Sequence, residues 1–364
     1  MASARRVTGP GRVNLIGDHT DYNQGLALPL AIDLGTTVEF TPTEARQLLF
    51  FSTLAPRGVS LRRDIPLDSA VLTSMEPPWT RPIAAMIALA RPERGGVARI
   101  ETTLPIGAGL SSSAALMVAL AELLGIEGSA LTIARLCRQA ETFAGVPVGL
   151  MDPLVCAGGR AGHAMLIDFA RSAFDYVSLP AEVEIVIVDS GTRRDLRDGR
   201  YAARVAECDA AAAVIGPLGL AAADDIPGLR DPLLERRARH VVTECERVRQ
   251  MAEALESDEP EVAGRVMVES HRSLAGDFEV STPTLDDLVE RLTALDGVYG
   301  ARSTGAGFGG CVVALARPGA IDLAAFPTPA WRVRSVDGTA AHRGADGSAL
   351  TPDAGPVQAV GSSD

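Results

Sequence analysis

The chain has 364 residues and a mass of 38.0 kDa, a length that corresponds to about two domains of average size. Apolar residues make up 47% of the chain and charged residues 22%, and no apolar run approaches the roughly 18 residues of a membrane span, so we expect a soluble globular protein without a membrane partner. All 34 basic residues are arginine, against 46 acidic residues and a net charge of −12, which excludes a Walker P-loop lysine and a pyridoxal-phosphate Schiff base and argues against a nucleic-acid partner.

The first half of the chain combines predicted strands with predicted helices. From residue 7 to about 105, short β-branched runs such as 36–40 and 48–52 are separated by Gly, Pro and Asp, which is typical of strands. Small and straight-chain residues then dominate at 111–124 and at 132–143, and these residues favour helices. The pattern therefore predicts an α+β region.

The second half begins with a predicted strand at 184–189 and then becomes mainly helical. The clearest helix signal spans 231–257, where apolar residues recur at every third or fourth position and predict one buried stripe, namely Leu234, Ala238, Val241, Cys245, Val248, Met251 and Leu255. We expect the opposite face to be solvated, namely Arg236, Arg239, Thr243, Glu246, Arg247 and Gln250. Strand signals return at 297–303 and 311–315.

The change in composition near residues 171–182 predicts a domain boundary. We therefore expect an N-terminal domain at residues 1–176 and a C-terminal domain at 177–340. Beyond about residue 340 the chain is rich in Gly, Ala, Ser, Pro and Asp, so residues 341–364 are predicted to be a disordered tail.

The five cysteines do not form a recognisable framework. They are odd in number, widely spaced and surrounded by apolar or helical sequence, so we expect buried thiols and neither disulfides nor a zinc site. The first residues, MASARRVTGPGR, lack the apolar stretch of a secretory signal. Both observations predict a reduced, cytoplasmic protein.

A glycine-serine loop, PIGAGLSSSA at residues 105–114, lies between a predicted strand and a predicted helix. Its glycines let the backbone approach a ligand, and the helix N-terminus that follows offers unpaired N–H groups to an anion such as a phosphate. The serine hydroxyls can cap the helix or bind magnesium. A simple Ser N-cap after a glycine turn explains the loop as well, and the spacing does not match the dinucleotide fingerprint.

A polar cluster lies near the N-terminus, where residues 11–23 read GRVNLIGDHTDYN. Asp, His and Asn side chains at this density can read several hydroxyl groups of a polyol. The alternative is a network of Asx turns around a capped element.

Two further segments contain unusual residues. Asp152 lies among apolar residues, so its carboxylate needs a partner, for which Arg12 is the natural candidate; an ordinary Asp-Pro turn is the alternative. The run STGAGFGGC at residues 303–311 joins two predicted strands, and its glycines permit close backbone approach, although a plain β-hairpin connection would also use them.

Together these motifs resemble the galactokinase family of the GHMP small-molecule kinase superfamily. The run at 11–23 differs from that family's signature mainly at Asp18, where the family has Glu, and the second and third superfamily motifs correspond to residues 105–115 and 304–311. The resemblance spans about residues 8–336 and includes the segments 237–244, 268–274 and 277–281.

The resemblance implies a two-domain α+β fold. An N-terminal α/β domain of the ribosomal-protein type would pair with a C-terminal ferredoxin-like domain, and the active site would lie between them. The implied reaction is ATP-dependent transfer of the γ-phosphoryl group to the anomeric hydroxyl of galactose, with Mg²⁺ as cofactor. We expect a monomer whose partners are the sugar and ATP.

The resemblance also assigns residues. Asp152 would orient or deprotonate the attacking hydroxyl, and Arg12 would pair with Asp152 and stabilise transition-state charge. The sugar would be contacted by Asp18, His19, Asp21, Gly149 and Tyr201. The phosphates would be bound by Gly107, Gly109, Leu110, Ser111, Ser112 and Ser113. Ser113 and Glu141 would hold magnesium, and Trp79 would line the adenine pocket.

The chain departs from the family pattern in ways that affect the substrate more than the reaction. The family Glu at the position of Asp18 is implied to read the hydroxyl at carbon 6, Pro153 replaces a usual Gln, and the segment before Gly11 is short. A related anomeric kinase acting on L-arabinose or galacturonate is one alternative. A catalytically silent, galactokinase-like sugar sensor is another, although the presence of the catalytic and metal residues favours a kinase.

Overall fold

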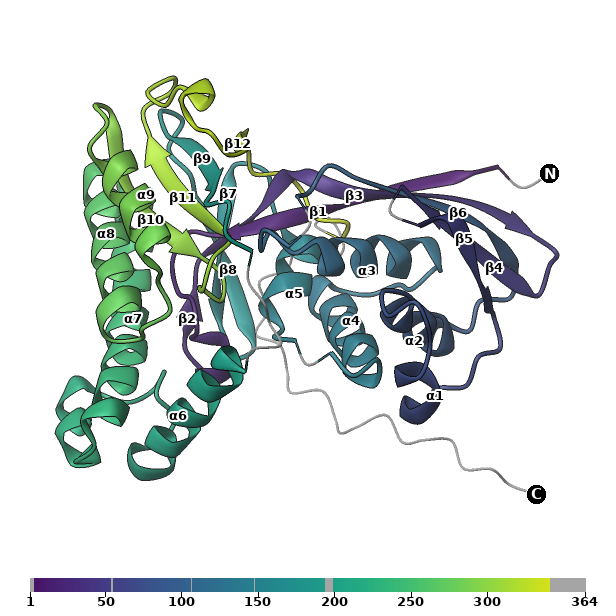
Figure 1. Ribbon diagram of the computed structural model, residues 1–364, viewed down its shortest axis with the longest axis horizontal. Helices are drawn as coiled ribbons and strands as arrows, with labels where there is room; N and C mark the ends of the chain where they lie inside the picture. Colours follow the sequence, from purple (N-terminus) through teal and green to yellow (C-terminus); the bar gives the residue numbers. More distant parts are fainter. Residues whose placement is uncertain (1–2, 54, 106, 147, 194–198, 341–364) are drawn as a thin grey trace.

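The computed structural model describes residues 3–53, 55–105, 107–146, 148–193 and 199–340 (Figure 1). The predicted tail at 341–364 lies outside the described residues. Helices and sheets are mixed throughout, so the α+β prediction is confirmed. In the described part of the chain, no helix is both long and apolar enough to cross a membrane.

The N-terminal half is a five-stranded sheet covered on one face by helices (Figure 1). Only the β4–β6 pair is parallel; the other neighbours in the sheet are antiparallel. The strands, in their order across the sheet, are β1 (Arg5–Asn14), β3 (Pro29–Thr43), β6 (Gly95–Thr102), β4 (Gln47–Ser52) and β5 (Ala55–Arg62). The helices are α1 (Ser69–Thr73), α2 (Thr80–Ala90), α3 (Ser112–Leu123), α4 (Ala130–Phe143) and α5 (Met151–Gly158).

The C-terminal half is a four-stranded antiparallel sheet with long helices packed against it (Figure 1). The strands, in order, are β10 (Val298–Thr304), β11 (Cys311–Ala316), β9 (Glu184–Asp189) and β12 (Ala330–Val333). The helices are α6 (Arg200–Ile215), α7 (Pro232–Glu256), α8 (Pro260–Gly276) and α9 (Pro283–Thr293), with 3-10 turns η3 (Ala223–Leu229) and η4 (Leu323–Ala325).

A small sheet and one shared core connect the two halves. The sheet contains β2 (Leu26–Ala27), β7 (His163–Asp168) and β8 (Ala173–Ser178). Val13 and Leu15 from the N-terminal half share a hydrophobic cluster with Val248 and Val313 from the C-terminal half. Burying apolar surface from both halves in one cluster holds them together. The end of the described chain returns to the N-terminal half, where the Gly338 N–H donates to the Gly159 carbonyl. These contacts do not test the domain boundary expected between residues 176 and 177, which stays a prediction.

The apolar spacing of helix α7 correctly predicts its buried stripe, but one residue of the predicted solvated face differs. The predicted stripe is buried, except that Leu234 is only partly buried. Asp231 caps the helix by accepting the Leu233 N–H, and Pro232 follows at the first helical position, which suits its fixed φ. The prediction for Arg247 is wrong: only 12% of its side chain is exposed, because it forms an ion pair with buried Glu244.

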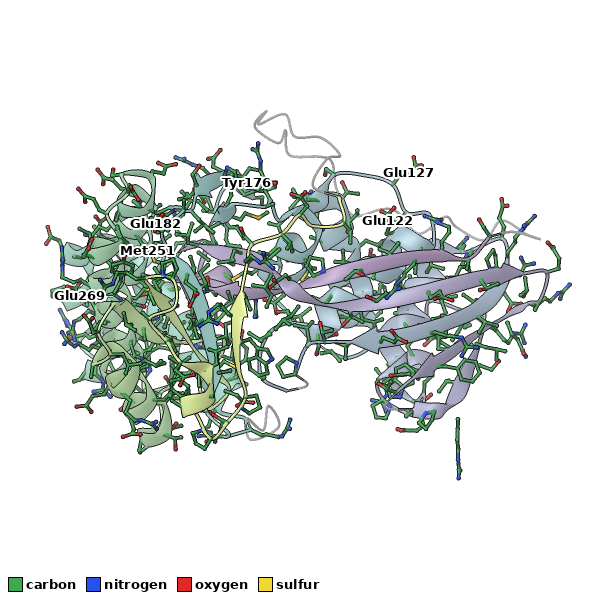
Figure 2. The ribbon with its side chains drawn as sticks, turned by 90° about the horizontal axis from the view of Figure 1, so that it is seen from above. Glu122, Glu127, Tyr176, Glu182, Met251 and Glu269 are labelled. Atoms are coloured by element: carbon green, nitrogen blue, oxygen red, sulfur yellow. The ribbon has the colours of Figure 1, made fainter. Side chains whose placement is uncertain are left out.

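The surface and the cysteines agree with the sequence analysis. Exposed carboxylates such as Glu127, Glu182 and Glu269 project outward from both halves (Figure 2). Met251 of α7, by contrast, is buried in the shared core. All five cysteines are buried, as the sequence predicts.

Candidate active site

The site is built around an ion pair between β1 and α5. The Arg12 Nε donates to Asp152 Oδ1 at 2.7 Å, and its Nη2 donates to Asp152 Oδ2 at 2.8 Å. This contact is bidentate, since two N–H groups of the planar guanidinium donate to the two carboxylate oxygens. Such a charge-assisted hydrogen bond is stronger than a hydrogen bond between neutral groups. The side chain of Arg12 is 6% exposed, whereas that of Asp152 is 32% exposed. The Arg12–Asp152 pairing expected from the sequence is therefore present, and the carboxylate remains open to a ligand.

The glycine-serine loop contacts both members of this pair. Arg12 Nη1 donates to the Gly109 carbonyl at 2.5 Å, and Ser111 Oγ donates to Asp152 Oδ2 at 2.5 Å. Ser111 occupies the N-cap position of α3, but its side chain makes no capping hydrogen bond. The alternative interpretation of the loop as a simple Ser N-cap is therefore wrong, because the Ser111 hydroxyl donates to the Asp152 carboxylate and does not cap the helix.

The loop backbone has the conformation that its composition predicts. Gly107 and Gly109 have φ angles of +78° and +84°, and Ser111 has a φ of +62°. Only glycine adopts this left-handed region without steric cost. The N-terminus of α3 directly follows and presents unpaired N–H groups and the positive end of the helix dipole. One guanidinium nitrogen of Arg193 lies 3.2 Å from where a β-carbon on Gly107 would be.

The polar cluster predicted to read hydroxyl groups folds as a loop between β1 and β2, which we call the 15–25 loop. His19 Nδ1 is 3.0 Å from the Tyr22 hydroxyl, and the His19 ring lies 5.8 Å from the Tyr201 ring of α6. Asp21 begins the 3-10 turn η1 (Asp21–Asn23), and a β-carbon at Gly149 would collide with its Oδ2. The structure thus brings together His19, Asp21, Gly149 and Tyr201.

Burial shifts the pKa values of Asp21 and His19. Burial, and to a smaller extent the nearby charge of Asp152, raise the pKa of Asp21 to about 6. Burial lowers the pKa of His19 to about 3, so the imidazole is neutral at physiological pH. Gly149 lies against the Asp21 carboxylate just before α5, the helix that carries Asp152, so the 15–25 loop adjoins the Arg12–Asp152 pair.

Asp18 lies on the other side of this loop. It is 3% exposed, its Oδ2 is 2.7 Å from Arg302 Nη2, and its Oδ1 accepts the Gly305 N–H at 3.0 Å. The carboxylate is therefore bound to the C-terminal half, through β10 and the glycine run that follows it. That glycine run joins antiparallel neighbours β10 and β11, so it is a hairpin connection and also contacts the 15–25 loop. A contact of Asp18 with sugar stays a prediction.

The two residues expected to hold magnesium are adjacent. Ser113 Oγ donates to Glu141 Oε1 at 2.5 Å, and Glu141 is 1% exposed. Burial, together with the charge of Asp152, raises the pKa of Glu141 to about 7, although the hydrogen bond from Ser113 opposes this. A hydroxyl and a carboxylate oxygen are donors that Mg²⁺ accepts. Among the described residues, no group of three or more His, Cys, Asp or Glu side chains forms a metal cluster.

Trp79 lies directly before α2 and packs against the core of the N-terminal half. Its adenine contact stays a prediction. Four residues near the site had no role assigned from the sequence, namely Arg193, His240, Glu244 and Arg302. A signal did exist for two of them: Glu244 adjoins the apolar stripe of α7, and Arg302 interrupts an otherwise buried strand.

The chain is similar to known proteins in sequence. Three family profiles match: the galactokinase galactose-binding signature at residues 2–42, the N-terminal domain of GHMP kinases at 81–160, and their C-terminal domain at 251–326. The chain is 40% identical over 324 residues to the galactokinase of Homo sapiens, covering 85% of this chain and 83% of that protein. It is 38% identical to the galactokinase of Chloroflexus aggregans, covering 87% and 85%.

Solved structures give the same result for the fold. The crystal structure of Lactococcus lactis galactokinase complexed with galactose matches with a TM-score of 0.84 and 27% identity, covering 92% of this chain and 94% of that one. The mevalonate kinase of Methanococcus jannaschii matches with a TM-score of 0.68 at 19% identity, covering 92% and 99%, and so shares the fold. The expected two-domain GHMP kinase fold is confirmed.

Proposed function

Because this chain belongs to the galactokinase family of the GHMP kinases, we propose that it transfers the γ-phosphoryl group of ATP to the anomeric hydroxyl of galactose. The observation that carries this proposal is the Arg12–Asp152 ion pair, which contacts the glycine-serine loop and adjoins the 15–25 loop. Release of ADP in the presence of galactose tests it. A protein that binds galactose and ATP but releases no ADP would be a sugar sensor instead.

In the proposed reaction, Asp152 orients the anomeric hydroxyl and accepts its proton. The hydroxyl oxygen attacks the γ-phosphorus, the bond to the β–γ bridging oxygen breaks, and ADP leaves. Arg12 holds the carboxylate in place and stabilises negative charge in the transition state. Phosphoryl transfer depends mainly on positioning and charge stabilisation, so no lysine is required.

The sugar would bind between Asp152 and the 15–25 loop. His19, Asp21 and Tyr201 supply hydrogen-bonding groups there, and the absence of a side chain at Gly149 lets the Asp21 carboxylate lie close to its backbone. The imidazole of His19 is neutral, and its Nδ1 lies beside the Tyr22 hydroxyl, so its Nε2 is the ring nitrogen that would bind a sugar hydroxyl. We include Asp18 among the proposed sugar contacts.

ATP would bind with its phosphates on the glycine-serine loop, at residues 107–113, and its adenine beside Trp79. The backbone N–H groups at the start of α3 favour anionic groups. Arg193, next to Gly107, adds a positive charge at this loop. The net charge of −12 opposes ATP only weakly, because salt screens charges beyond about 10 Å.

Mg²⁺ would bind through Ser113 and Glu141, whose oxygen donors suit it. When bound, it would neutralise charge on the phosphates of ATP. For the cellular setting we propose a cytoplasmic monomer. The five widely spaced cysteines, all buried, support a reducing compartment. Size-exclusion chromatography of the purified protein tests the monomer.

Replacement of Glu141 tests the proposed magnesium site. Glu141→Ala should raise the Mg²⁺ concentration needed for half-maximal rate, because an ion that keeps few protein ligands loses one of them. The galactose KM should change less. Steady-state rates over a magnesium titration measure both, with exposed Glu127→Ala as the control. An unchanged magnesium dependence in Glu141→Ala would show that Glu141 has only a structural role.

Replacement of Asp18 tests the substrate. Its side chain is one methylene shorter than the family Glu, so we expect galactose to be preferred over glucose but only weakly over 6-deoxygalactose. Asp18→Glu should then increase the preference for galactose over 6-deoxygalactose by about 10-fold, the lower range for a hydrogen bond to a charged group. The measurement is kcat/KM for galactose, glucose, 6-deoxygalactose, L-arabinose and galacturonate, with exposed Asp175→Glu as the control. A wild-type preference for L-arabinose or galacturonate would contradict galactose as the substrate and leave the kinase activity standing.

A further inference from the structure

The backbone of the 15–25 loop is held from both halves. On the N-terminal side, Leu28 accepts the Leu15 N–H and donates to the Ile16 carbonyl. The contacts from the C-terminal side are made by buried side chains. Arg302 of β10 donates from Nη1 to the Leu15 carbonyl at 3.1 Å, and Glu244 of α7 accepts the Gly17 N–H at 3.0 Å. Just before the loop, Thr304 Oγ1 donates to the Asn14 carbonyl at 2.9 Å and accepts the Asn14 N–H at 3.2 Å. The contacts from the C-terminal side join residues that are more than 200 positions apart in the chain.

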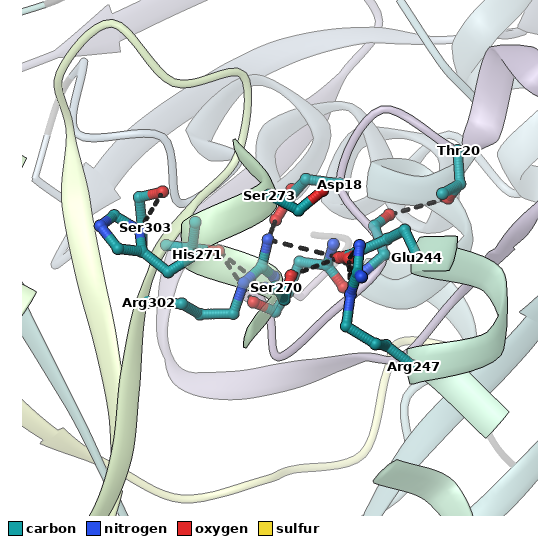
Figure 3. Close-up of polar contacts among 12 residues, drawn as sticks. Asp18, Thr20, Glu244, Arg247, Ser270, His271, Ser273, Arg302 and Ser303 are labelled. Carbon is teal, nitrogen blue, oxygen red and sulfur yellow. Dashed lines mark hydrogen bonds and ion pairs between the residues drawn. The ribbon is translucent and has the colours of Figure 1, made fainter. Parts of the chain in front are cut away.

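Arg302 and Glu244 are linked inside a buried cluster of charges (Figure 3). Both side chains are 0% exposed, and Arg302 Nη2 lies 3.7 Å from Glu244 Oε1 and 2.7 Å from Asp18 Oδ2. Glu244 also accepts the Ser270 hydroxyl at 2.6 Å and pairs with Arg247 at 2.8 Å. Two guanidinium groups thus balance two carboxylates. A buried cluster of this kind is weak evidence for stability, because desolvation offsets the attraction between its charges.

The cluster is connected to the residues that face the site. His240 Nε2 lies 3.3 Å from the Asp18 carbonyl, and the next residue, His19, has a φ of +64°. His19 and Asp21 follow directly on the segment that Arg302 and Glu244 hold. A displacement of that segment would move both side chains relative to Asp152. Misplacement by about 1 Å is enough to weaken productive binding strongly.

Resting on the proposed function, we propose that Arg302 and Glu244 are positioning residues for the sugar. They do not touch substrate. They fix the backbone from Leu15 to Asp18, so that the affinity for galactose depends on them, whereas the affinity for ATP does not. The phosphate-binding loop is held by Arg12 and lies on the N-terminal half, which is why the two affinities separate.

Two conservative variants test the proposal. Glu244→Gln keeps the shape and an acceptor oxygen but removes the charge that faces Arg302; Arg302→Lys keeps the charge but cannot span Leu15 and Asp18 together. Each should raise the galactose KM, and the galactose Kd measured by calorimetry, by about 10-fold or more. Arg302→Lys loses a hydrogen bond made by a charged group, and Glu244→Gln loses the charge that pairs with Arg302. The ATP KM should stay within about two-fold, because binding of ATP does not involve the segment.

The control is another ion pair of the C-terminal half. Arg332 Nε is 2.7 Å from Glu184 Oε2, on the paired strands β12 and β9. Glu184→Gln should leave both KM values unchanged. If Glu244→Gln and Arg302→Lys lower the Tm but leave the galactose KM within about two-fold of wild type, the two residues are only structural and the proposal is wrong.

A measurement on the wild-type protein decides the matter if a variant does not fold. Galactose alone should slow amide hydrogen exchange in residues 15–19 and also in 240–247 and 302–305, because the cluster couples these segments. ATP alone should not. Protection by galactose confined to the N-terminal half would overturn the proposal. A wild-type protein that neither binds nor phosphorylates galactose would instead overturn the proposed function.

Discussion

Asp152→Asn should lower kcat with galactose by about 100-fold or more while leaving galactose binding nearly intact. An amide cannot accept the proton of the anomeric hydroxyl, and loss of a general base typically costs roughly 10²- to 10⁴-fold in rate. The substitution keeps the shape of the side chain that accepts from Arg12 at 2.7 Å and from Ser111 at 2.5 Å. We therefore expect the binding site for the sugar to remain formed.

Turnover measured by ADP release, beside galactose affinity measured by calorimetry, tests this expectation. Asp175→Asn, at an exposed position of β8, is the matched control and should have wild-type turnover. A rate close to wild type in Asp152→Asn would contradict the assignment of Asp152 as the proton acceptor. A loss of galactose affinity equal to the loss of rate would show that Asp152 acts in binding and not in the transfer step.

Arg302→Met should lower the free energy of unfolding by about 3–5 kcal/mol, the usual cost of removing one partner from a buried ion pair. The Arg302 side chain is 0% exposed and lies 2.7 Å from Asp18, so methionine would leave a buried carboxylate without its counter-charge. Urea unfolding followed by circular dichroism measures the change. The double variant Arg302→Met/Asp18→Asn should recover part of the loss, because it also removes that charge.

The same substitution on the surface provides the comparison. Arg317 pairs with Asp296 at 3.0 Å, but the two side chains are 56% and 100% exposed. Arg317→Met should cost no more than about 1 kcal/mol, since exposed ion pairs contribute little. Equal losses in the two variants would mean that burial of Arg302 does not determine its contribution.

Local features of the site could be predicted from the sequence because they depend on neighbouring residues. The glycines at 107 and 109 permit the left-handed conformations that the structure has, and the three- and four-residue apolar spacing of 231–257 predicts one buried face. The Arg12–Asp152 pair could also be predicted, although the two residues are 140 positions apart. A carboxylate among apolar residues needs a cation, and the resemblance of residues 11–23 to the galactokinase signature selects Arg12 from the 34 arginines.

Only the tertiary structure decided which partners the remaining polar groups have. Ser111 has the local sequence of a helix cap, yet its hydroxyl donates to Asp152, because packing of α5 brings the carboxylate there. Arg247 has the spacing of a solvated residue, yet it pairs with Glu244. Asp18 meets Arg302 only because β10 lies beside the 15–25 loop. Periodicity reports which face of an element is apolar, but a polar side chain beside that face is buried or solvated according to what packs against it, and no local pattern contains that information.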